Sequence, residues 1–570
     1  MTTITLTAED FQFLTAFVTM MIFAVTLFCA LPSGANKENT AIARLQNALG
    51  ATRWPTKWFV AVAVCWAVLA LSLFGGLIAT IGMIVHQLFF AADFTTNRIP
   101  LIQLAALTAT LGAVVALPFT VIRLKLTQQQ TETAKAALFN TKITEAAADL
   151  HAQRQISKKT GVRSWETLWE DDITRRNAAI DRLEGLVREE PHEAVRVSRL
   201  LSVYVRELSK AYPAKLPPDK ENVDKIQDWA GDLKVQRSDM QNAVQVLGRL
   251  AVNAPDYKKD FEIDLRGANL QSMDLRDLNF EQAKLMSAEL QGANLYSAEL
   301  QGANLSDAKL QGANLSDAKL QGANFYSAEL QGAKLMSAEL QWANLSDAEL
   351  QGANLMSAEL QWAKLMSAGL RGANLMSAEL QGAKLSDAKL QGANLSDAKL
   401  QGANLSDAKL QWAKLSDAEL QGADLSDAKL QGANLSDAKL QGADLSDAKL
   451  KGANLMDSEL QGANLSDAEL QGAKLTGAKL KGAKLMSANL DQKSNLTEAN
   501  LLGASVRFVD FTNVPQITPH LRDVFGDGSV TLPPDTSPPP YWPQKKDLSY
   551  EEFHAKWRAF AASKGVHLPD

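Results

Sequence analysis

Leucine or phenylalanine returns at every fifth position from Leu265 to Leu490, and this period restricts the possible folds more than any other feature of the sequence. In an α-helix of about 3.6 residues per turn, a period of five would scatter these side chains around the surface. In a flat strand, an odd period would place alternate leucines on opposite faces. Because neither element can bury this pattern, we predict short extended segments that alternate with corners.

An alanine stands two residues before nearly all of these leucines, so both side chains of a short extended segment can point inward. Repeated corners wind the chain into coils, which stack about 4.8 Å apart and pair their backbones with the coils above and below. We therefore predict a β-solenoid over residues 255–511. Its core is predicted to contain, in two neighbouring decapeptides, Ala303, Leu305, Ala308, Leu310, Leu315 and Leu320.

The repeated A(N/D)LXX pattern, as in ANLSD at residues 303–307, resembles the pentapeptide-repeat family. The 46 consecutive units between Leu265 and Leu490 make this motif highly specific. The resemblance implies a right-handed quadrilateral β-helix with four units per coil. The register slips by one residue at Asp491–Asn495 and then resumes, which predicts a bulge or loop near the far end.

Four units per coil would place residues twenty apart above one another. Asn304 and Asn324 are then predicted to belong to an amide ladder. Lys389, Lys409 and Lys429 would form a column of like charges, and the Asp two residues before each is expected to offset their repulsion. Local balance of this kind favours solubility.

The amino-terminal 125 residues are predicted to form a membrane anchor, because they contain three long apolar stretches, residues 11–31, 58–90 and 99–122. At about 1.5 Å per residue, each stretch is long enough to cross the ~30 Å hydrocarbon core of a bilayer. The segment before the first stretch contains Glu9 and Asp10 but no Lys or Arg, which argues against a cleaved signal peptide.

The distribution of Lys and Arg predicts the orientation of this anchor. Residues 32–57 contain four of these basic residues, whereas residues 1–10 contain none. With the amino terminus outside, the basic loop and everything after the third stretch lie in the cytoplasm. We therefore predict a multi-pass protein of the bacterial inner (cell) membrane, with the lipid bilayer as one partner and a cytoplasmic repeat domain.

Residues 126–254 are predicted to form a cytoplasmic helical connector and an amino-terminal cap for the solenoid. Two apolar stripes on either side of Pro191 predict a helical hairpin, and Ser238 with Gln241 predicts a capping box at the start of another helix. Residues 127–157 are interpreted as a solvated helical stalk. The alternative is a coiled coil that oligomerises the anchor, and the sequence does not determine the oligomeric state.

Residues 512–570 are predicted to cap the other end, because an open solenoid end exposes apolar core and unpaired edges. They contain a proline-rich segment at residues 533–543. Ser549 and Glu552 predict a capping box. The helix after it is predicted to pack on the last coils through Phe553, Trp557 and Phe560. The whole chain is therefore an α+β multidomain protein.

The repeats provide little material for catalysis. Residues 263–490 contain no His and no Cys, so a metal site or a His-activated nucleophile has no ligands or base there. We predict that the protein is not an enzyme and holds no cofactor and no metal. The net charge of −6 and the absence of a polybasic segment give no indication of a nucleic-acid partner.

Three outward positions that glycine normally holds carry tryptophan instead, and two of them should lie one above the other on the same face. A column of methionines occupies the same coils. Exposed apolar patches mark interaction surfaces. The candidate surface for an unidentified protein partner consists of Trp342, Trp362, Met336, Met356 and Met376, with Trp412 on the opposite face.

These features predict a non-catalytic, membrane-anchored scaffold or protein-interaction rod. The whole chain also resembles membrane-anchored pentapeptide-repeat proteins of proteobacteria, with YVREL at residues 204–208. The alternative is a DNA-mimicking inhibitor or protector of a DNA-binding enzyme such as gyrase, because the family includes quinolone-resistance proteins. Residues 263–490 hold 28 acidic and 21 basic residues, a weak imitation of one charge per ~1.7 Å of duplex.

Overall fold

A computed structural model describes residues 54–90, 98–159, 165–217, 222–546 and 548–568, together with residues 43, 45–46, 49 and 51–52. The chain divides into two compact units, residues 1–142 and residues 143–570. The first predicted apolar stretch, residues 11–31, lies outside the described residues.

Two apolar helices make up most of the described part of the first unit. Helix α3 (Thr56–Phe90) runs unbroken for 35 residues through Gly75 and Gly76. Helix α4 (Arg98–Asp149) contains the third apolar stretch and continues beyond it. Both helices are long and apolar enough to cross a membrane, with mean hydropathies of 2.4 and 2.0 over their candidate spans.

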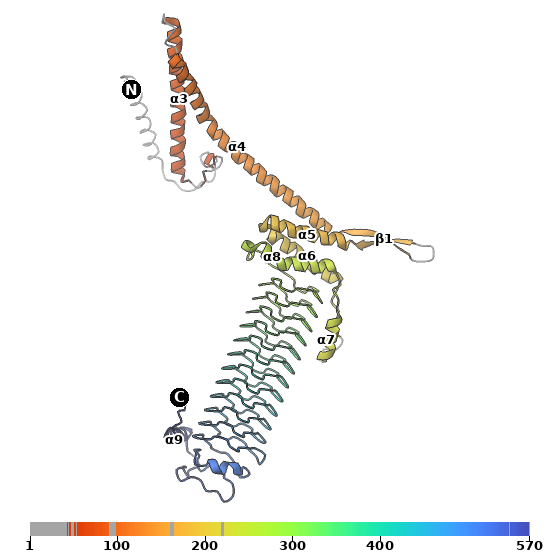
Figure 1. Ribbon diagram of the computed structural model, residues 1–570, viewed down its shortest axis with the longest axis vertical. Coiled ribbons are helices and arrows are strands. Elements are labelled where there is room, and N and C mark those ends of the chain that lie inside the picture. Colours follow the sequence, from red (N-terminus) through yellow and green to blue (C-terminus); the bar gives the residue numbers. More distant parts are fainter. Residues whose placement is uncertain are drawn as a thin grey trace, which may run out of the picture. The chain divides into compact units, whose positions relative to one another are not determined.

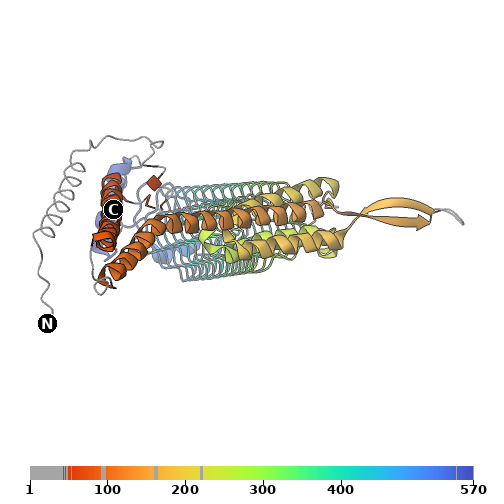
Figure 2. The same ribbon diagram turned by 90° about the horizontal axis from the view of Figure 1, so that it is seen from above.

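The second unit contains a β-hairpin that the sequence did not reveal (Figure 2). Strands β1 (Gln153–Lys159) and β2 (Trp165–Asp171) pair antiparallel, with Gln153 opposite Asp171. Most side chains of β1 are exposed, so its sequence lacks the apolar alternation of a half-buried strand. The connector predicted over residues 126–254 is therefore not helical throughout.

Helices surround the start of the solenoid. Their bounds are α5 (Ile173–Glu189), α6 (Ala194–Ala211), α7 (Val223–Asp232) and α8 (Ser238–Asn253). The predicted helical hairpin is formed by α5 and α6, which are separated by the 3-10 turn η2 (Pro191–Glu193). Ile180, Leu183 and Val187 are fully buried on α5. Both α5 and α6 pack against α8, next to the first coils (Figure 1).

The capping box predicted at Ser238 and Gln241 is wrong. Helix α8 begins at Ser238, so Arg237 occupies the N-cap position, and its side chain makes no capping hydrogen bond. The Arg237 guanidinium instead forms ion pairs with Asp239 and Asp171. Ion pairing with carboxylates, rather than a hydroxyl cap, therefore accompanies the start of this helix.

Parallel pairing between successive coils builds the solenoid (Figure 1). Bridges join residues twenty positions apart, starting with Asp264 and Lys284, so each coil contains four five-residue units. The Leu305 N–H donates to the Asn324 carbonyl at 2.7 Å, and the Asn324 N–H donates to the Ala303 carbonyl at 2.9 Å. The β-solenoid predicted from the period of five is confirmed.

The interior of the coils is filled by the predicted alanine and leucine positions. None of the following side chains has exposed surface: Ala303, Leu305, Ala308, Leu310, Leu315 and Leu320. Fully burying one leucine contributes about 1.5–3 kcal/mol relative to leaving it exposed. Outside the coils, the Asn324 amide donates to Asn304 Oδ1 at 3.3 Å, as expected for the amide ladder.

Nearly every corner between two extended segments contains one residue in the left-handed region of the backbone. Gly302 has a φ of 65°, and Asp307 has a φ of 56°. Glycine adopts this conformation without strain, and Asp and Asn tolerate it better than most residues. The frequent Gly and Asp in the decapeptide are therefore a requirement of the corners.

The predicted one-residue slip at Asp491–Asn495 is present, because the bridge spacing changes there from twenty to twenty-one residues. The Asp491 carboxylate accepts the N–H groups of Gly472 at 2.8 Å and of Lys493 at 3.0 Å. It thereby satisfies backbone donors that the bulge would leave unpaired.

Pairing continues beyond the predicted end of the solenoid. Ser505 pairs with Phe525, and Asp510 pairs with Thr531. Between these segments the chain forms the 3-10 helix η4 (Pro515–His520). The segment that the sequence assigned to a separate cap therefore contributes backbone to the last coils.

Helices α6 and α8 cover backbone groups of the first coil. The Ser209 hydroxyl accepts the N–H of Asn269 at 2.9 Å, and the Gly248 carbonyl accepts the N–H of Asn279 at 3.0 Å. An uncovered sheet edge invites pairing with another chain. These contacts therefore block the amino-terminal edge of the solenoid.

Helix α9 (Tyr550–Ser563) packs against the last coils and begins with the predicted capping box. Phe553 and Trp557 are buried in a cluster with Phe525. The Trp557 indole N–H donates to the Gly503 carbonyl at 2.7 Å. Apolar burial and this hydrogen bond together attach the helix to the coil.

Helix α7 lies along a corner at which successive coils carry glycine. The Gln227 amide donates to the Gly332 carbonyl at 3.1 Å. A Cβ atom added at Gly312 would lie only 2.6 Å from the Cβ of Ala230. Glycine at this corner therefore leaves the space that the helix occupies.

We expect Gly312→Trp to displace α7, because the corner backbone accepts tryptophan elsewhere whereas the helix would clash with it. Amide hydrogen exchange over residues 223–232 should become at least about tenfold faster, which corresponds to ~1.4 kcal/mol of lost local protection. Gly322→Trp is the matched control, because no described atom lies within 4 Å of a Cβ at that corner. Unchanged exchange in Gly312→Trp would contradict the docking of α7.

Candidate interaction surface

Trp342 and Trp362 lie one above the other at a corner of adjacent coils. Their ring centroids are 5.6 Å apart, and the ring planes differ by 10°. Trp342 is 65% exposed and Trp362 is 54% exposed. The two rings therefore form a stacked aromatic surface in contact with solvent.

Both tryptophans hold a backbone conformation that disfavours large side chains. The φ of Trp342 is 63°, and that of Trp362 is 62°. A bulky residue in this left-handed region costs roughly 1–2 kcal/mol, whereas glycine in the same corner has no such cost. Folding alone therefore favours glycine at both positions.

The rings lean toward the next coil. A Cβ atom added at Gly382 would lie 2.6 Å from Cε3 of Trp362, so this ring covers that glycine corner. At Gly322, one coil before Trp342, a Cβ would meet no described atom within 4 Å. The face of Trp342 that is turned away from Trp362 is therefore left open above a corner without a side chain.

The predicted methionine column occupies the neighbouring corner of the same coils. Met336, Met356 and Met376 are all half-buried. Between the methionine corner and the tryptophan corner, the extended segments present three glutamates. These are Glu339, Glu359 and Glu379. The sequence-based candidate surface omitted these carboxylates, although the twenty-residue spacing could have revealed them.

Ion pairs on this face join glutamate and lysine of successive coils. In each of four pairs, the lysine Nζ donates to Oε1 of a glutamate twenty residues away at 2.7–3.0 Å. The pairs are Glu299–Lys319, Glu379–Lys399, Glu419–Lys439 and Glu459–Lys479. Each exposed pair is worth less than about 1 kcal/mol, but together they neutralise most of this column.

Glu339 and Glu359 differ from the four paired glutamates of the column in their ion pairs. Their hydrogen bonds are the usual ones, because each accepts a glutamine amide at Oε2, from Gln321 and Gln341 respectively. In the part of the chain that the structure describes, neither carboxylate forms an ion pair. Glu359 therefore adds negative charge beside the two tryptophans, whereas Lys319 lies one coil before Glu339 and interacts with it electrostatically.

At the opposite corner, lysine instead of glutamate precedes the tryptophan. Trp412 is 73% exposed and leans over Gly432. Lys409 and Lys414 stand on either side of it in the sequence. Among the described residues, Lys409 forms no ion pair with the Asp two positions earlier, so the expected offset within a unit does not take the form of direct pairing.

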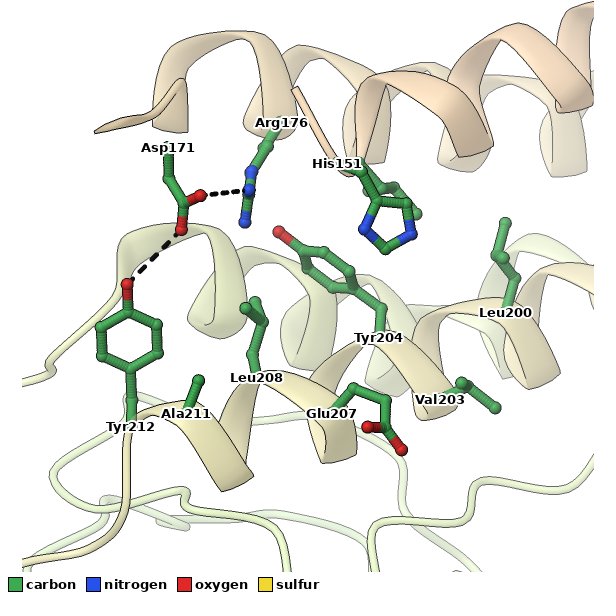
Figure 3. Close-up of a pocket in the computed structure, with 11 residues that line it drawn as sticks. His151, Asp171, Arg176, Leu200, Val203, Tyr204, Glu207, Leu208, Ala211 and Tyr212 are labelled. Atoms are coloured by element: carbon green, nitrogen blue, oxygen red, sulfur yellow. Dashed lines mark hydrogen bonds and ion pairs between the residues drawn. The ribbon is translucent and has the colours of Figure 1, made fainter. Parts of the chain in front are cut away.

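A buried polar network lies at the amino-terminal end of the second unit, beside a pocket of about 280 Å³ (Figure 3). Arg237 binds Asp239 at 2.5 Å and Asp171 at 2.6 Å. The Tyr204 hydroxyl donates to Asp239 at 2.8 Å. Arg176 binds the other oxygen of Asp171 at 2.5 Å, so the network connects β2, α5, α6 and α8.

The network balances two guanidinium groups against two carboxylates. Burial by itself would raise the pKa of Asp239, but hydrogen bonds from Arg237 and Tyr204 hold that pKa below its ordinary value. Burial and the neighbouring Asp239 raise the pKa of Tyr204. Because each buried charge has a partner, this arrangement fixes the helices relative to one another rather than presenting a reactive group.

The pocket beside the network has mainly apolar walls. Figure 3 shows Tyr204 between His151 and Arg176, with Leu200, Val203 and Leu208 around it. The described residues include no group of three or more His, Cys, Asp or Glu side chains that could hold a metal ion.

Comparison with known proteins agrees with this geometry. The family model described as pentapeptide repeats matches the solenoid in eight copies that run from residue 263 to residue 492. Through these residues, the chain belongs to the pentapeptide-repeat family. No curated protein matches the chain.

Several solved structures are similar to part of this chain. HetL, involved in heterocyst differentiation regulation in Nostoc sp. strain PCC 7120, is 32% identical to this chain. The match covers 40% of this chain and 88% of HetL, with a TM-score of 0.15. A pentapeptide-repeat protein of the Arabidopsis thaliana thylakoid lumen is 30% identical, with 24% and 80% covered and a TM-score of 0.14. The plasmid-mediated fluoroquinolone resistance protein QnrB1 is 17% identical, with 38% and 91% covered and a TM-score of 0.18.

We expect Asp239→Asn to destabilise the second unit by on the order of 3 kcal/mol, because it leaves the buried Arg237 with one full carboxylate partner fewer. The lowered pKa of Asp239 also predicts a pH effect. Its contribution is complete above about pH 3.9 and disappears as the pH falls through its folded pKa. Urea denaturation followed by circular dichroism at several pH values measures both effects.

Asp397→Asn is the control, because Asp397 is exposed at a corner that also accepts Asn. Its denaturation midpoint should remain within about 0.5 kcal/mol of the unmodified protein. Equal stability of the Asp239 variant and this control would contradict the structural role of the network.

Proposed function

We propose that this pentapeptide-repeat protein is a non-catalytic scaffold that holds a rigid interaction rod at a membrane. The anchor has three spans, over residues 11–31, 58–90 and 99–122, and the rod is a right-handed quadrilateral β-helix in the cytoplasm. The observation that carries the proposal is the stacked pair of exposed tryptophans, Trp342 and Trp362, on an otherwise polar solenoid.

The tryptophans support a binding role because their rings are exposed and their backbone conformation favours glycine. The equivalent corners of the coils before and after them contain glycine, which suits the positive φ better. Exposed apolar side chains also add an aggregation hazard. Strained and exposed residues of this kind are typical of functional surfaces.

The membrane part of the proposal is supported by α3 and α4, which satisfy the length and hydropathy of membrane spans. The four basic residues of residues 32–57 support a cytoplasmic position for that loop and for the repeats. Membrane attachment would hold the interaction surface near the bilayer and restrict the partners that it meets.

A DNA-mimicking role is less well supported by the surface. DNA presents a regular series of negative charges, about one per 1.7 Å of duplex. On this solenoid, lysines interrupt the acidic column through the four ion pairs described above. A second column contains Lys389, Lys409, Lys429 and Lys449 in succession. The scaffold is therefore the function that we favour.

We expect crosslinking in native membranes, followed by detergent extraction, to capture a protein partner on the full chain. The double variant Trp342→Gly with Trp362→Gly should lose at least about 90% of this capture, as expected for the removal of aromatic hot-spot side chains. Trp412→Gly is the matched control and should retain it. Equal capture by all three proteins would remove this surface from the proposed function.

The proposed orientation is tested with sealed inverted membrane vesicles, in which cytoplasmic domains face outward. Added protease should release repeat fragments from inverted vesicles and leave them protected in right-side-out spheroplasts. Protection in the inverted vesicles would place the repeats on the other side of the membrane and would overturn the cytoplasmic assignment.

A further inference from the structure

We propose that the surface formed by Trp342, Trp362, Glu339 and Glu359 binds arginine side chains of a partner protein. This inference rests on the proposed interaction role and specifies the chemistry of the partner. The surface combines exposed aromatic rings with two carboxylates that form no ion pair among the described residues. Arginine suits both features, because its guanidinium stacks on aromatic rings and forks onto carboxylates.

The first argument concerns one atom of the glutamate column. In four glutamates of the column, Oε1 accepts the ammonium group of a lysine at 2.7–3.0 Å. In Glu339 and Glu359, Oε2 has the usual glutamine partner, but Oε1 has no hydrogen-bond partner among the described residues. Oε1 of these two glutamates can therefore accept a hydrogen bond from a cation of another molecule.

The second argument is the coincidence of these two glutamates with the two tryptophans. The residue one coil after Glu339 and Glu359 is again glutamate, and these two glutamates stand in the coils whose neighbouring corner carries tryptophan. Gln341, which precedes Trp342, donates to Glu359, so the carboxylate and the aromatic corner are linked through adjacent residues.

The third argument is the contrast with the other exposed tryptophan. Trp412 occupies the same kind of corner and is also exposed, but Lys409 precedes it where Glu339 and Glu359 precede the stacked pair. Lys414 follows Trp412 as Lys364 follows Trp362, so the two corners differ in the residue that comes before the ring. A lysine at that position repels a guanidinium, whereas a glutamate attracts it.

The test uses the full chain in a nonionic detergent and a fluorescein-labelled decapeptide of alternating Arg and Gly, followed by fluorescence anisotropy. The two double variants are Trp342→Gly with Trp362→Gly, and Glu339→Lys with Glu359→Lys. Glycine and lysine stand at equivalent positions of other coils, so both variants retain residues that the solenoid already accepts. Circular dichroism confirms folding of each protein.

We expect each double variant to weaken binding of the Arg peptide by at least ~tenfold, the loss expected for removing a desolvated cation–π contact or two carboxylates. Trp412→Gly should bind like the unmodified protein. A peptide in which Lys replaces Arg should bind at least ~tenfold more weakly than the Arg peptide. A peptide in which Glu replaces Arg should show no detectable binding.

Three outcomes would overturn the inference. They are equal binding by all variants, equal affinity for the Lys peptide, and loss of binding in the glutamate variant alone, which would indicate non-specific electrostatic attraction. Failure of the peptide test is distinguishable from failure of the proposed function. A partner captured in membranes through Trp342 and Trp362, without affinity for the Arg peptide, would retain the scaffold and exclude this chemistry.

Discussion

Burial of one alanine and one leucine in every five residues is the constraint on which the solenoid depends. The two side chains fill the coil, and backbone pairing twenty residues apart holds each coil on the next. Since each inward side chain is in contact with its own coil and its neighbours, the core is nearly the same at every level. Variation is therefore confined to the outward positions, and any specific function must be located there.

The outward positions are arranged in columns, because one coil contains two decapeptide repeats. A decapeptide repeat in a twenty-residue coil makes opposite faces alike. Departures from the decapeptide break this symmetry at single positions. Replacement of lysine by Glu339 and Glu359 and of glycine by Trp342 and Trp362 makes one face different from all others. A binding surface can thus arise from four substitutions without any change in the core.

The period of five was sufficient to predict the solenoid and its core, which follow from local spacing alone. The alignment of Trp342 over Trp362 also required the four units per coil that the family resemblance implied. Features that depend on contacts between distant segments were missed or wrong, such as the start of α8, where Arg237 pairs with Asp171 across 66 residues. The lack of ion pairs at Glu339 and Glu359 could be predicted from the sequence only in part. It follows from the column of residues twenty apart, but only when ion pairs are sought between coils instead of within a unit.

Glycine corners show why the same solenoid can carry both internal and external contacts. Helix α7 fills one such corner near Gly312, and the carboxyl-terminal segment fills another, where Val566 would lie 2.8 Å from a Cβ at Gly503. Tryptophan at the equivalent place closes the corner and replaces a groove with a raised aromatic surface. Both glycine and tryptophan leave the backbone pairing intact, because the Trp342 N–H still donates to the Gln361 carbonyl at 3.1 Å. The choice of corner residue therefore changes which segments can bind at the corner without changing the coil. The corner residue therefore determines which partners the solenoid can accept, and the inward residues determine only that it folds.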